Sequence, residues 1–296
     1  MNRRRSEWRG YVFVAPATLY LLLFSFVPMV VAAWMSVHRW HLLKPDRPFV
    51  GLDNFTALAA DPFFRNAAYN SFLFAALSVP LCVVTALLVA LLVHQPLRAV
   101  GFFRTLYFVP AVSSQAALAM VWIWVFLPDS GLVNFVLRAC GYAGQTDFLN
   151  DTSWALPALV LMSAWIGLGP RMVIFVAGLQ SIPETLYEAA NLDGAGAWRR
   201  FRYVTLPLLV PTTLFVVVTT TIAAFQFFTP IYMITKGGPR RTTDVVAYHI
   251  YKEAWMRFEV GLASAQSYVL FAMILAFALL QFHLLRRGMG EQEAPA

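Results

Sequence analysis

Six long apolar runs, separated by shorter polar segments, dominate the pattern of this chain. A helix needs about 20 apolar residues to cross a bilayer, and each run reaches that length. The runs occupy residues 11–36, 69–93, 107–127, 154–179, 205–230 and 263–285. The pattern therefore predicts an all-α, polytopic membrane protein with six transmembrane helices. Residues 11–287 form its single membrane domain, and no soluble domain is attached.

The polar segment 180–204, between the fourth and fifth runs, predicts a short helix in water. Pro183 suits a first helical position, because its missing N–H would have no partner there. The helix is expected to cover about 184–192 and to end at Gly194, which adopts positive φ without steric cost. A helix this short is unstable alone. Its apolar ridge consists of Leu186, Ala189 and Ala190. Such a ridge is typical of a helix that binds in a groove of another protein.

Composition supports the membrane assignment. The chain is 59% hydrophobic and 12% charged, with a mean hydropathy of +0.64, whereas a soluble domain has roughly 25% charged residues. A basic leader precedes the first run, but that run exceeds the roughly 7–15 apolar residues of a signal-peptide core. We therefore expect an uncleaved membrane anchor.

The positive charges predict the orientation. The segments 1–10, 94–105, 180–204 and 286–296 hold 11 Lys or Arg in 58 residues, and the other loops hold 10 in 90. This density favours a cytoplasmic N-terminus at 1–10 and a short, disordered cytoplasmic tail at 288–296. The basic residues form no stripe and no nucleic-acid-binding motif, so membrane lipid rather than nucleic acid accounts for the net charge of +7.

Several prolines and glycines lie inside the predicted spans and predict kinks or breaks. They are Pro16, Pro28, Pro80, Gly167, Gly169, Pro170 and Pro211. Arg171, directly after Pro170, is the only formally charged side chain in the six spans. Buried charges in a membrane are costly and face a bundle interior or a cavity. Arg171 is therefore a candidate for lining a translocation path. The alternative is a structural arginine that pairs with a carbonyl or extends its side chain toward a membrane interface.

A spaced motif follows the predicted short helix. It reads Glu188-Ala189-Ala190, three residues, Gly194, nine residues, then Val204-Thr205-Leu206-Pro207. This order resembles the cytoplasmic signature of permease subunits in binding-protein-dependent ABC importers, with Val204 where isoleucine is usual. Two further stretches resemble the carbohydrate-uptake (maltose/glycerol-phosphate-type) branch. They are Gly51–Phe55 and the Thr235–Pro239 turn, which is followed by Tyr251 and Gly261–Ala265. The resemblance runs from about Trp8 to Arg287.

The resemblance implies a type I ABC importer permease fold in a bacterial-type plasma (inner) membrane. It also implies a second homologous permease, an ABC ATPase dimer and an extracytoplasmic solute-binding protein as partners. Contact with the ATPase is expected at Glu184, Glu188, Ala189, Ala190, Gly194, Leu206 and Pro207. The chain has no G-x-x-x-x-G-K-[ST] phosphate loop, so the partner must bind and hydrolyse ATP. No catalytic, cofactor or metal site is predicted.

The expected substrate is a sugar or related polyol. A site that binds a sugar needs hydrogen-bonding groups and aromatic rings, and the end of the fifth run offers both. The substrate-path candidates are Gln226, Phe225, Phe228, Thr229, Arg171, Trp165, Ser264 and Gln266. Gln226 and Thr229 are three residues apart and are expected to share a helix face.

Two other classes of protein compete with this prediction. A secondary transporter or channel that acts without an ATPase would need coupling carboxylates or histidines in its spans. No predicted span contains Asp or Glu, and His283 lies at a membrane edge. A membrane enzyme would need acidic residues or histidines clustered at one face. Cys82 lies within a span and Cys140 in a loop, so no disulfide is predicted.

Overall fold

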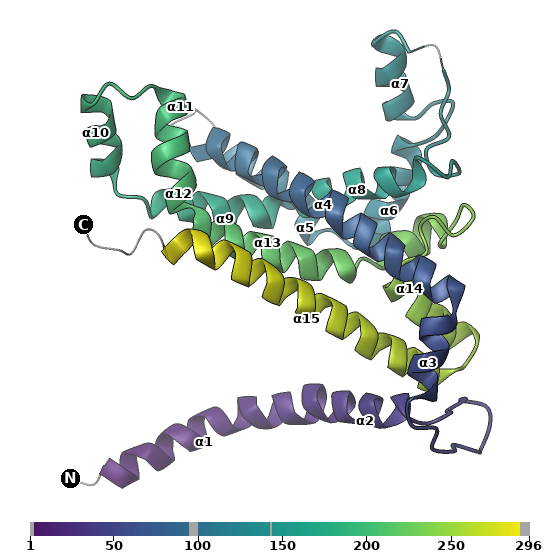
Figure 1. Ribbon diagram of the computed structural model, residues 1–296. Coiled ribbons are helices and arrows are strands. Elements are labelled where there is room, and N and C mark those ends of the chain that lie inside the picture. The colour runs from purple at the N-terminus through teal and green to yellow at the C-terminus, as the bar shows by residue number, and fades with distance from the viewer. Residues whose placement is uncertain (1–2, 95–99, 143, 291–296) are drawn as a thin grey trace. The chain divides into compact units, whose positions relative to one another are not determined.

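The computed structural model describes residues 3–94, 100–142 and 144–290 (Figure 1). The described residues form helices and loops, with only two isolated β-bridges and no strand. The prediction of an all-α protein is confirmed. The chain divides into two compact units, one of residues 1–65 with 249–271 and the other of residues 66–248 with 272–296.

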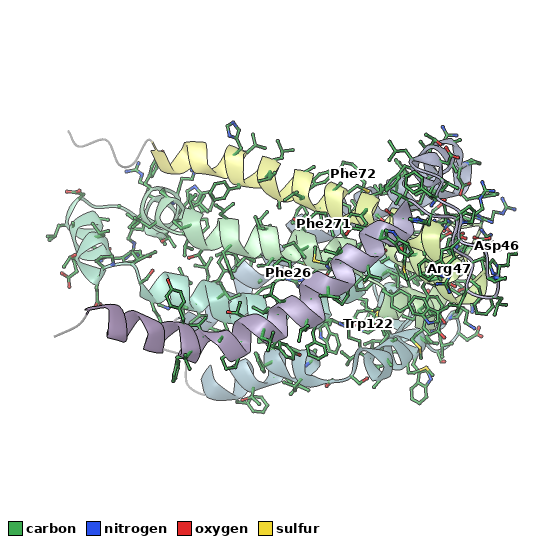
Figure 2. The ribbon with its side chains drawn as sticks, turned by 90° about the horizontal axis from the view of Figure 1, so that it is seen from below. Phe26, Asp46, Arg47, Phe72, Trp122 and Phe271 are labelled. Atoms are coloured by element: carbon green, nitrogen blue, oxygen red, sulfur yellow. The ribbon has the colours of Figure 1, made fainter. Side chains whose placement is uncertain are left out.

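The first unit begins with one long helical run. It consists of α1 (Arg3–Leu21), the π-helical turn η1 (Leu22–Phe26) and α2 (Val27–Ser36). Tyr11–Ser36 within this run is long and apolar enough to cross a membrane, as predicted. Pro16 lies inside α1 without breaking it. Phe26, labelled in Figure 2, is 55% exposed in this chain, as suits a side chain that faces lipid or another subunit.

The loop after α2 is fixed by local contacts. The Asn54 amide, on α3 (Asp53–Ala60), donates to the carbonyls of Ser36 and His38 at 2.7 and 3.0 Å. The Arg47 guanidinium, labelled in Figure 2, lies 4.0 Å from the centre of the Trp40 ring. These contacts order a polar segment that would otherwise expose its backbone.

The C-terminal part of the first unit starts at the end of α14 (Val246–Tyr251). It continues through the π-helical turn η4 (Lys252–Met256) into α15 (Val260–Gly290). Gly261, in the first turn of α15, donates its N–H to the Trp40 carbonyl at 3.0 Å. A side chain at this position would collide with the His38 carbonyl oxygen, so glycine allows the close approach.

The second unit is arranged along α4 (Pro62–His94), which contains Pro80 without a break. The other helices are α5 (Val100–Val112), α6 (Gln115–Val125), α7 (Leu132–Ala139), α8 (Ala155–Ile166), α9 (Leu168–Gln180), α10 (Glu184–Leu192), α11 (Ala197–Arg200), α12 (Leu206–Leu208) and α13 (Val210–Phe225). The π-helical turn η2 (Phe201–Thr205) joins α11 to α12, and η3 (Ile231–Thr235) follows α13. Leu209 and several residues of α9, among them Met172 and Phe175, form a buried core with small residues of α4.

Three of the six predicted spans are long helices in the structure, namely Tyr11–Ser36, Pro62–His94 and Val260–Leu284. The other three are pairs of helices with bends of 112°, 51° and 66°. The 51° bend lies at Gly167, where a break is predicted. The 112° bend between α5 and α6 lies at residues 113–114 and is not predicted.

The helix in the predicted fifth span ends earlier than predicted. Helix α13 ends at Phe225, so Gln226 and Thr229 do not share a helix face and that prediction is wrong. Pro230 lacks an N–H, and its ring crowds the carbonyl four residues before it, so it favours a helix end before this position. Proline does not force such an end, since α1 and α4 accommodate Pro16 and Pro80.

Glycine allows two close helix contacts in the second unit. A Cβ on Gly169 would lie 2.5 Å from the Tyr107 carbonyl oxygen and 2.8 Å from the Phe108 Cα, both on α5. A Cβ on Gly178 would lie 2.5 Å from the Thr212 hydroxyl on α13. Helix α9 therefore packs tightly against both helices, and any side chain at 169 would push α5 away.

The chain ends differ from the predicted segment boundaries. Helix α1 begins at Arg3, inside the predicted segment 1–10, and α15 continues to Gly290, inside the predicted tail 288–296. The rest of that tail, 291–296, lies outside the described residues.

Candidate functional site

The predicted short helix in the segment 180–204 is present as α10. It ends before Gly194, whose φ of +74° is the left-handed value expected there. No atom lies within 4 Å of a Cβ built on Gly194, so the backbone conformation, and not a contact, favours glycine. Pro183 caps α10 with a ψ of 131°, one residue before the first helical position that was predicted for it.

Helix α10 has no buried residue. Leu186, on the predicted apolar ridge, is 42% exposed, and Leu192 is 89% exposed. Both predicted contact carboxylates, Glu184 and Glu188, are also exposed. The free surface of α10 thus combines apolar and acidic side chains in the way that was predicted for a helix that docks in another protein.

Two side chains of α10 attach it to the segment that leads into α12 and α13. The Tyr187 hydroxyl lies 3.0 Å from the Thr205 hydroxyl. Arg200 on α11 donates from Nη1 to Asn191 Oδ1 at 2.6 Å. Thr205 directly precedes Leu206 and Pro207 of α12, and the segment that ends there meets α13 at 66°. The short helices are therefore tied to the span through side chains as well as through the chain itself.

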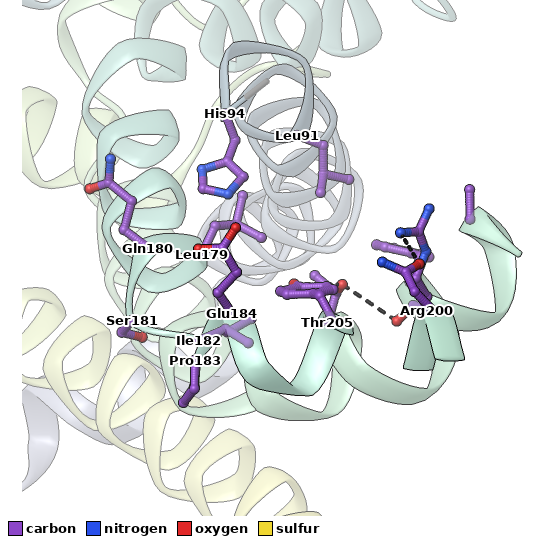
Figure 3. A pocket seen from close by; sticks show the side chains of 14 residues that line it. Leu91, His94, Leu179, Gln180, Ser181, Ile182, Pro183, Glu184, Arg200 and Thr205 are labelled. Carbon is purple, nitrogen blue, oxygen red and sulfur yellow. Dashed lines mark hydrogen bonds between the residues drawn. The ribbon is translucent and has the colours of Figure 1, made fainter. Parts of the chain in front are cut away.

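A groove of about 930 Å³ lies beneath these short helices (Figure 3). Its walls come from the end of α4, the end of α9, α10 and α11. They include Leu91, His94, Gln180, Ile182, Glu184, Tyr187, Asn191, Arg200 and Thr205. The groove places Glu184 and Thr205 on one surface with the last turn of α4.

A second, smaller cavity of about 180 Å³ gathers several predicted substrate-path residues. Its polar lining residues are Ser78, Gln115, Ser163, Arg171, Thr220 and Gln226, and its rings include Phe74, Phe227 and Phe228. Three of the predicted residues, Arg171, Gln226 and Phe228, therefore share one site. Neither Asp nor Glu lines this cavity.

Arg171 lies in the first turn of α9, directly after the break at Gly167. Its Nε donates to the Thr220 hydroxyl on α13 at 2.9 Å. Its Nη1 is buried and has no hydrogen-bond partner among the described residues. A Cβ on Gly167 would collide with the guanidinium, so glycine at this position makes room for the charge. Arg171 pairs with no carboxylate in the described part of the chain.

Ser78, on α4, contributes a second unpartnered polar group. Its side chain is 1% exposed, and its hydroxyl has no hydrogen-bond partner among the described residues. Ser163 differs, because its hydroxyl already donates to the Val160 carbonyl at 2.8 Å. Buried polar groups without partners are costly, and each one needs an explanation.

Other predicted path residues do not line this cavity. Phe225 is buried with its ring 5.4 Å from that of Phe277, and Trp165 packs edge-on against Trp122. Thr229 lies outside the helix to which it was assigned. Ser264 and Gln266 lie in the first unit, where Gln266 is buried without a hydrogen-bond partner and the Ser264 hydroxyl contacts Met35 Sδ at 3.9 Å.

Sequence reasoning missed four polar residues of the cavity, namely Ser78, Gln115, Ser163 and Thr220. A signal for each was present, because each is a polar residue inside an apolar run. Such residues are usually satisfied by their own helix, as Thr219 is by the Phe215 carbonyl at 2.7 Å. The apolar run alone does not show that Thr220, and not Thr219, lines the cavity.

The Thr235–Pro239 turn is held against α4. Lys236 and Gly237 have φ of 49° and 81°, and the Asn70 amide donates to the carbonyls of Arg241 and Asp244 at 2.7 and 3.0 Å. Burial, followed by the negative charge of Asp244, raises the pKa of the Tyr248 phenol. The phenol therefore stays protonated at neutral pH.

Residues 55–287 match the protein family described as the inner membrane component of binding-protein-dependent transport systems. The chain is 33% identical to the probable ABC transporter permease protein YurN of Bacillus subtilis, over 95% of this chain and 97% of the relative. It is 34% identical to the sn-glycerol-3-phosphate transport system permease protein UgpA of Agrobacterium fabrum, over 94% of both chains. It is also 34% identical to the lactose transport system permease protein LacF of Rhizobium radiobacter, over 96% of both.

The fold is similar to that of a chain in the crystal structure of a bacterial ABC transporter involved in the import of the acidic polysaccharide alginate. The TM-score is 0.81 at 24% sequence identity, over 96% of both chains. The family match covers most of the chain, and these relatives match it from end to end. The chain therefore belongs to the inner membrane components of binding-protein-dependent transport systems, as a multi-pass permease subunit of an ABC importer in the carbohydrate-uptake branch.

Proposed function

We propose that this chain forms half of the translocation path for a sugar or related polyol and pairs with a second, homologous permease. The cavity around Arg171 and Gln226 supports this assignment. Its volume of about 180 Å³ is below the roughly 300–1,000 Å³ of most ligand pockets. Gln226 is exposed in the single chain. A second permease that faces this cavity would enlarge and close the site.

We propose that an ABC ATPase dimer binds α10 and that ATP-driven closure moves α10 together with the fifth span. The observation that carries this proposal is that α10 is exposed and also tied to the start of the span. Its exposed side chains include Leu186, Glu188 and Leu192, and the Tyr187 hydroxyl contacts Thr205. A docked ATPase would cover the exposed side chains, and the contact with Thr205 would pass its movement on to the span. Glu184, Glu188, Ala189, Ala190 and Gly194, with Leu206 and Pro207 as the link to the span, are the proposed coupling residues.

The proposed topology has six spans and both termini in the cytoplasm. The geometry of α4 supports one part of it, which places the α10 loop and the Thr235–Pro239 turn on opposite sides of the membrane. Asn70 contacts the segment that follows the Thr235–Pro239 turn, whereas His94 lines the groove under α10. The helix between them is about 36 Å long at 1.5 Å per residue, and a hydrocarbon core is about 30 Å thick. The two loops are therefore far enough apart to lie on opposite sides of a membrane. The extracytoplasmic solute-binding protein is proposed to dock on the side of the Thr235–Pro239 turn.

Reconstitution tests the proposed function. The chain is co-expressed with the second permease, the ATPase and the solute-binding protein, and the purified complex is placed in proteoliposomes. We expect ATP-dependent accumulation of a sugar-like solute that requires all four proteins. The Glu188→Lys variant should lose most of the co-purifying ATPase, because it reverses a charge on the docking face. Uptake without an ATPase would instead favour a secondary transporter or channel.

Cysteine labelling tests the topology. Cys82 and Cys140 are free, and Cys140 is exposed, so both are first replaced. Single cysteines at Gly194 and Gly238 should then react with an impermeant reagent from opposite sides, with Gly194→Cys labelled only after permeabilisation. Labelling of both from the same side would contradict the six-span proposal.

A further inference from the structure

The cavity around Arg171 carries a positive charge that the described chain does not neutralise. The guanidinium has five N–H donors, and its one hydrogen bond to a described residue is the Nε contact with Thr220. No carboxylate lines the cavity, and no predicted span contains Asp or Glu. A charge kept within a membrane span needs a partner, since leaving it alone is costly.

One further feature adds a donor at the same place. Ser78 is almost completely buried, lines the cavity and has an unpartnered hydroxyl. A buried polar group without a partner needs an explanation, and a bound solute that accepts a hydrogen bond would supply one.

We propose that this cavity binds the negatively charged group of the imported solute, so that the substrate is an anionic sugar or polyol that carries a phosphate or a carboxylate. This inference rests on the proposed function of the cavity as part of the substrate path. Arg171 supplies the charged donors, and Ser78 supplies a neutral hydrogen bond to the same group. Hydrogen bonds between charged partners are roughly twice as strong as neutral ones, so Arg171 is the residue that discriminates between charged and neutral solutes.

The test uses the complete complex with its solute-binding protein in proteoliposomes. The liposomes receive ATP on the ATPase side and a mixture of neutral sugars, polyols, sugar phosphates and sugar acids. Mass spectrometry of the lumen identifies what is imported. We expect a solute with a phosphate or a carboxylate, and the mixture distinguishes these two groups. Import of neutral solutes alone would overturn the inference and leave the proposed function intact. Import of nothing would count against both.

Variants then assign the effect to the cavity. Arg171→Gln should raise the half-saturating concentration of the anionic solute about 10- to 100-fold, since hydrogen bonds to charged groups are strong. Arg171→Lys keeps the charge, so its half-saturating concentration should lie between those of Arg171→Gln and the original protein. Ser78→Ala should raise the half-saturating concentration by less than Arg171→Gln. Co-purification of both permeases and the ATPase controls for folding.

Two results would overturn the role of Arg171. One is unchanged uptake of the anionic solute by both Arg171 variants. The other is loss of the second permease from the Arg171→Gln complex, which would mean that a carboxylate of that permease, and not the solute, is the partner of the guanidinium.

Discussion

The α10 region and the cavity around Arg171 differ in what each lacks. Helix α10 has ordered hydrogen bonds on one face and no buried residue, so it lacks a covering surface. The cavity has partly buried walls and a positive charge, so it lacks an opposite charge and a few hydrogen-bond acceptors. The exposed surface of α10 is suited to a protein partner, and the positively charged cavity is suited to a small anionic solute. Substitutions in the two regions should therefore affect different measurements.

The largest effect is expected at Gly194. Gly194→Val forces a β-branched residue to adopt a φ of +74°, which costs roughly 1–2 kcal/mol even before branching is considered. Transport and ATPase co-purification should both fall at least about tenfold, while membrane insertion stays normal. The matched control is Gly196→Ala in the same loop, because Gly196 has a negative φ and open space around its Cβ position. Equal activity of the two variants would contradict the assignment of the loop.

An intermediate effect is expected at Thr220. Thr220→Val keeps the shape but removes the acceptor for Arg171 Nε. The hydrogen bond contributes roughly 0.5–1.5 kcal/mol to holding the guanidinium in place, so the half-saturating solute concentration should rise about fivefold while ATPase co-purification is unchanged. Thr219→Val is the matched control, because that exposed hydroxyl bonds only to its own helix. If Thr219→Val has the larger effect, the cavity is not the substrate site.

A smaller effect is expected at Gln226. Gln226→Leu removes a donor and an acceptor at the cavity, but the side chain is exposed in the single chain and makes no hydrogen bond to another described residue. A net hydrogen bond contributes roughly 0.5–1.5 kcal/mol, so uptake affinity should fall about threefold. Basal ATP hydrolysis should not change. Uptake kinetics identical to those of the original protein would remove Gln226 from the path.

The smallest effect is expected at Tyr187. Tyr187→Phe removes the hydroxyl contact with Thr205 and keeps the ring in the groove. We expect the number of ATP molecules hydrolysed per solute to rise about twofold, because α10 is held less firmly to the span and a neutral hydrogen bond is modest. Tyr203→Phe is the control, since Tyr203 is 76% exposed. If ATP hydrolysis per solute rises more in Tyr203→Phe than in Tyr187→Phe, the contact between Tyr187 and Thr205 does not hold α10 to the span.

The sequence predicted the α10 region well and the cavity only in part. Helix α10 and the turn at Gly194 depend on local rules, since a proline, a short amphipathic helix and a glycine with positive φ are all encoded by neighbouring residues. The cavity depends on helices far apart in sequence. Ser78 and Thr220 belong to it only because α4, α9 and α13 meet, and hydrophobic periodicity says nothing about that meeting. The bend at 113–114, which places Gln115 at the cavity, depends in the same way on tertiary packing.

The lack of a side chain at Gly167 also has an evolutionary consequence. A larger residue at position 167 would require the flexible end of the Arg171 side chain to shift. Relatives that keep an arginine at the position of Arg171 but gain a side chain at the position of Gly167 should therefore hold the guanidinium elsewhere in the cavity. Such relatives are expected to differ in the charged solutes that they accept.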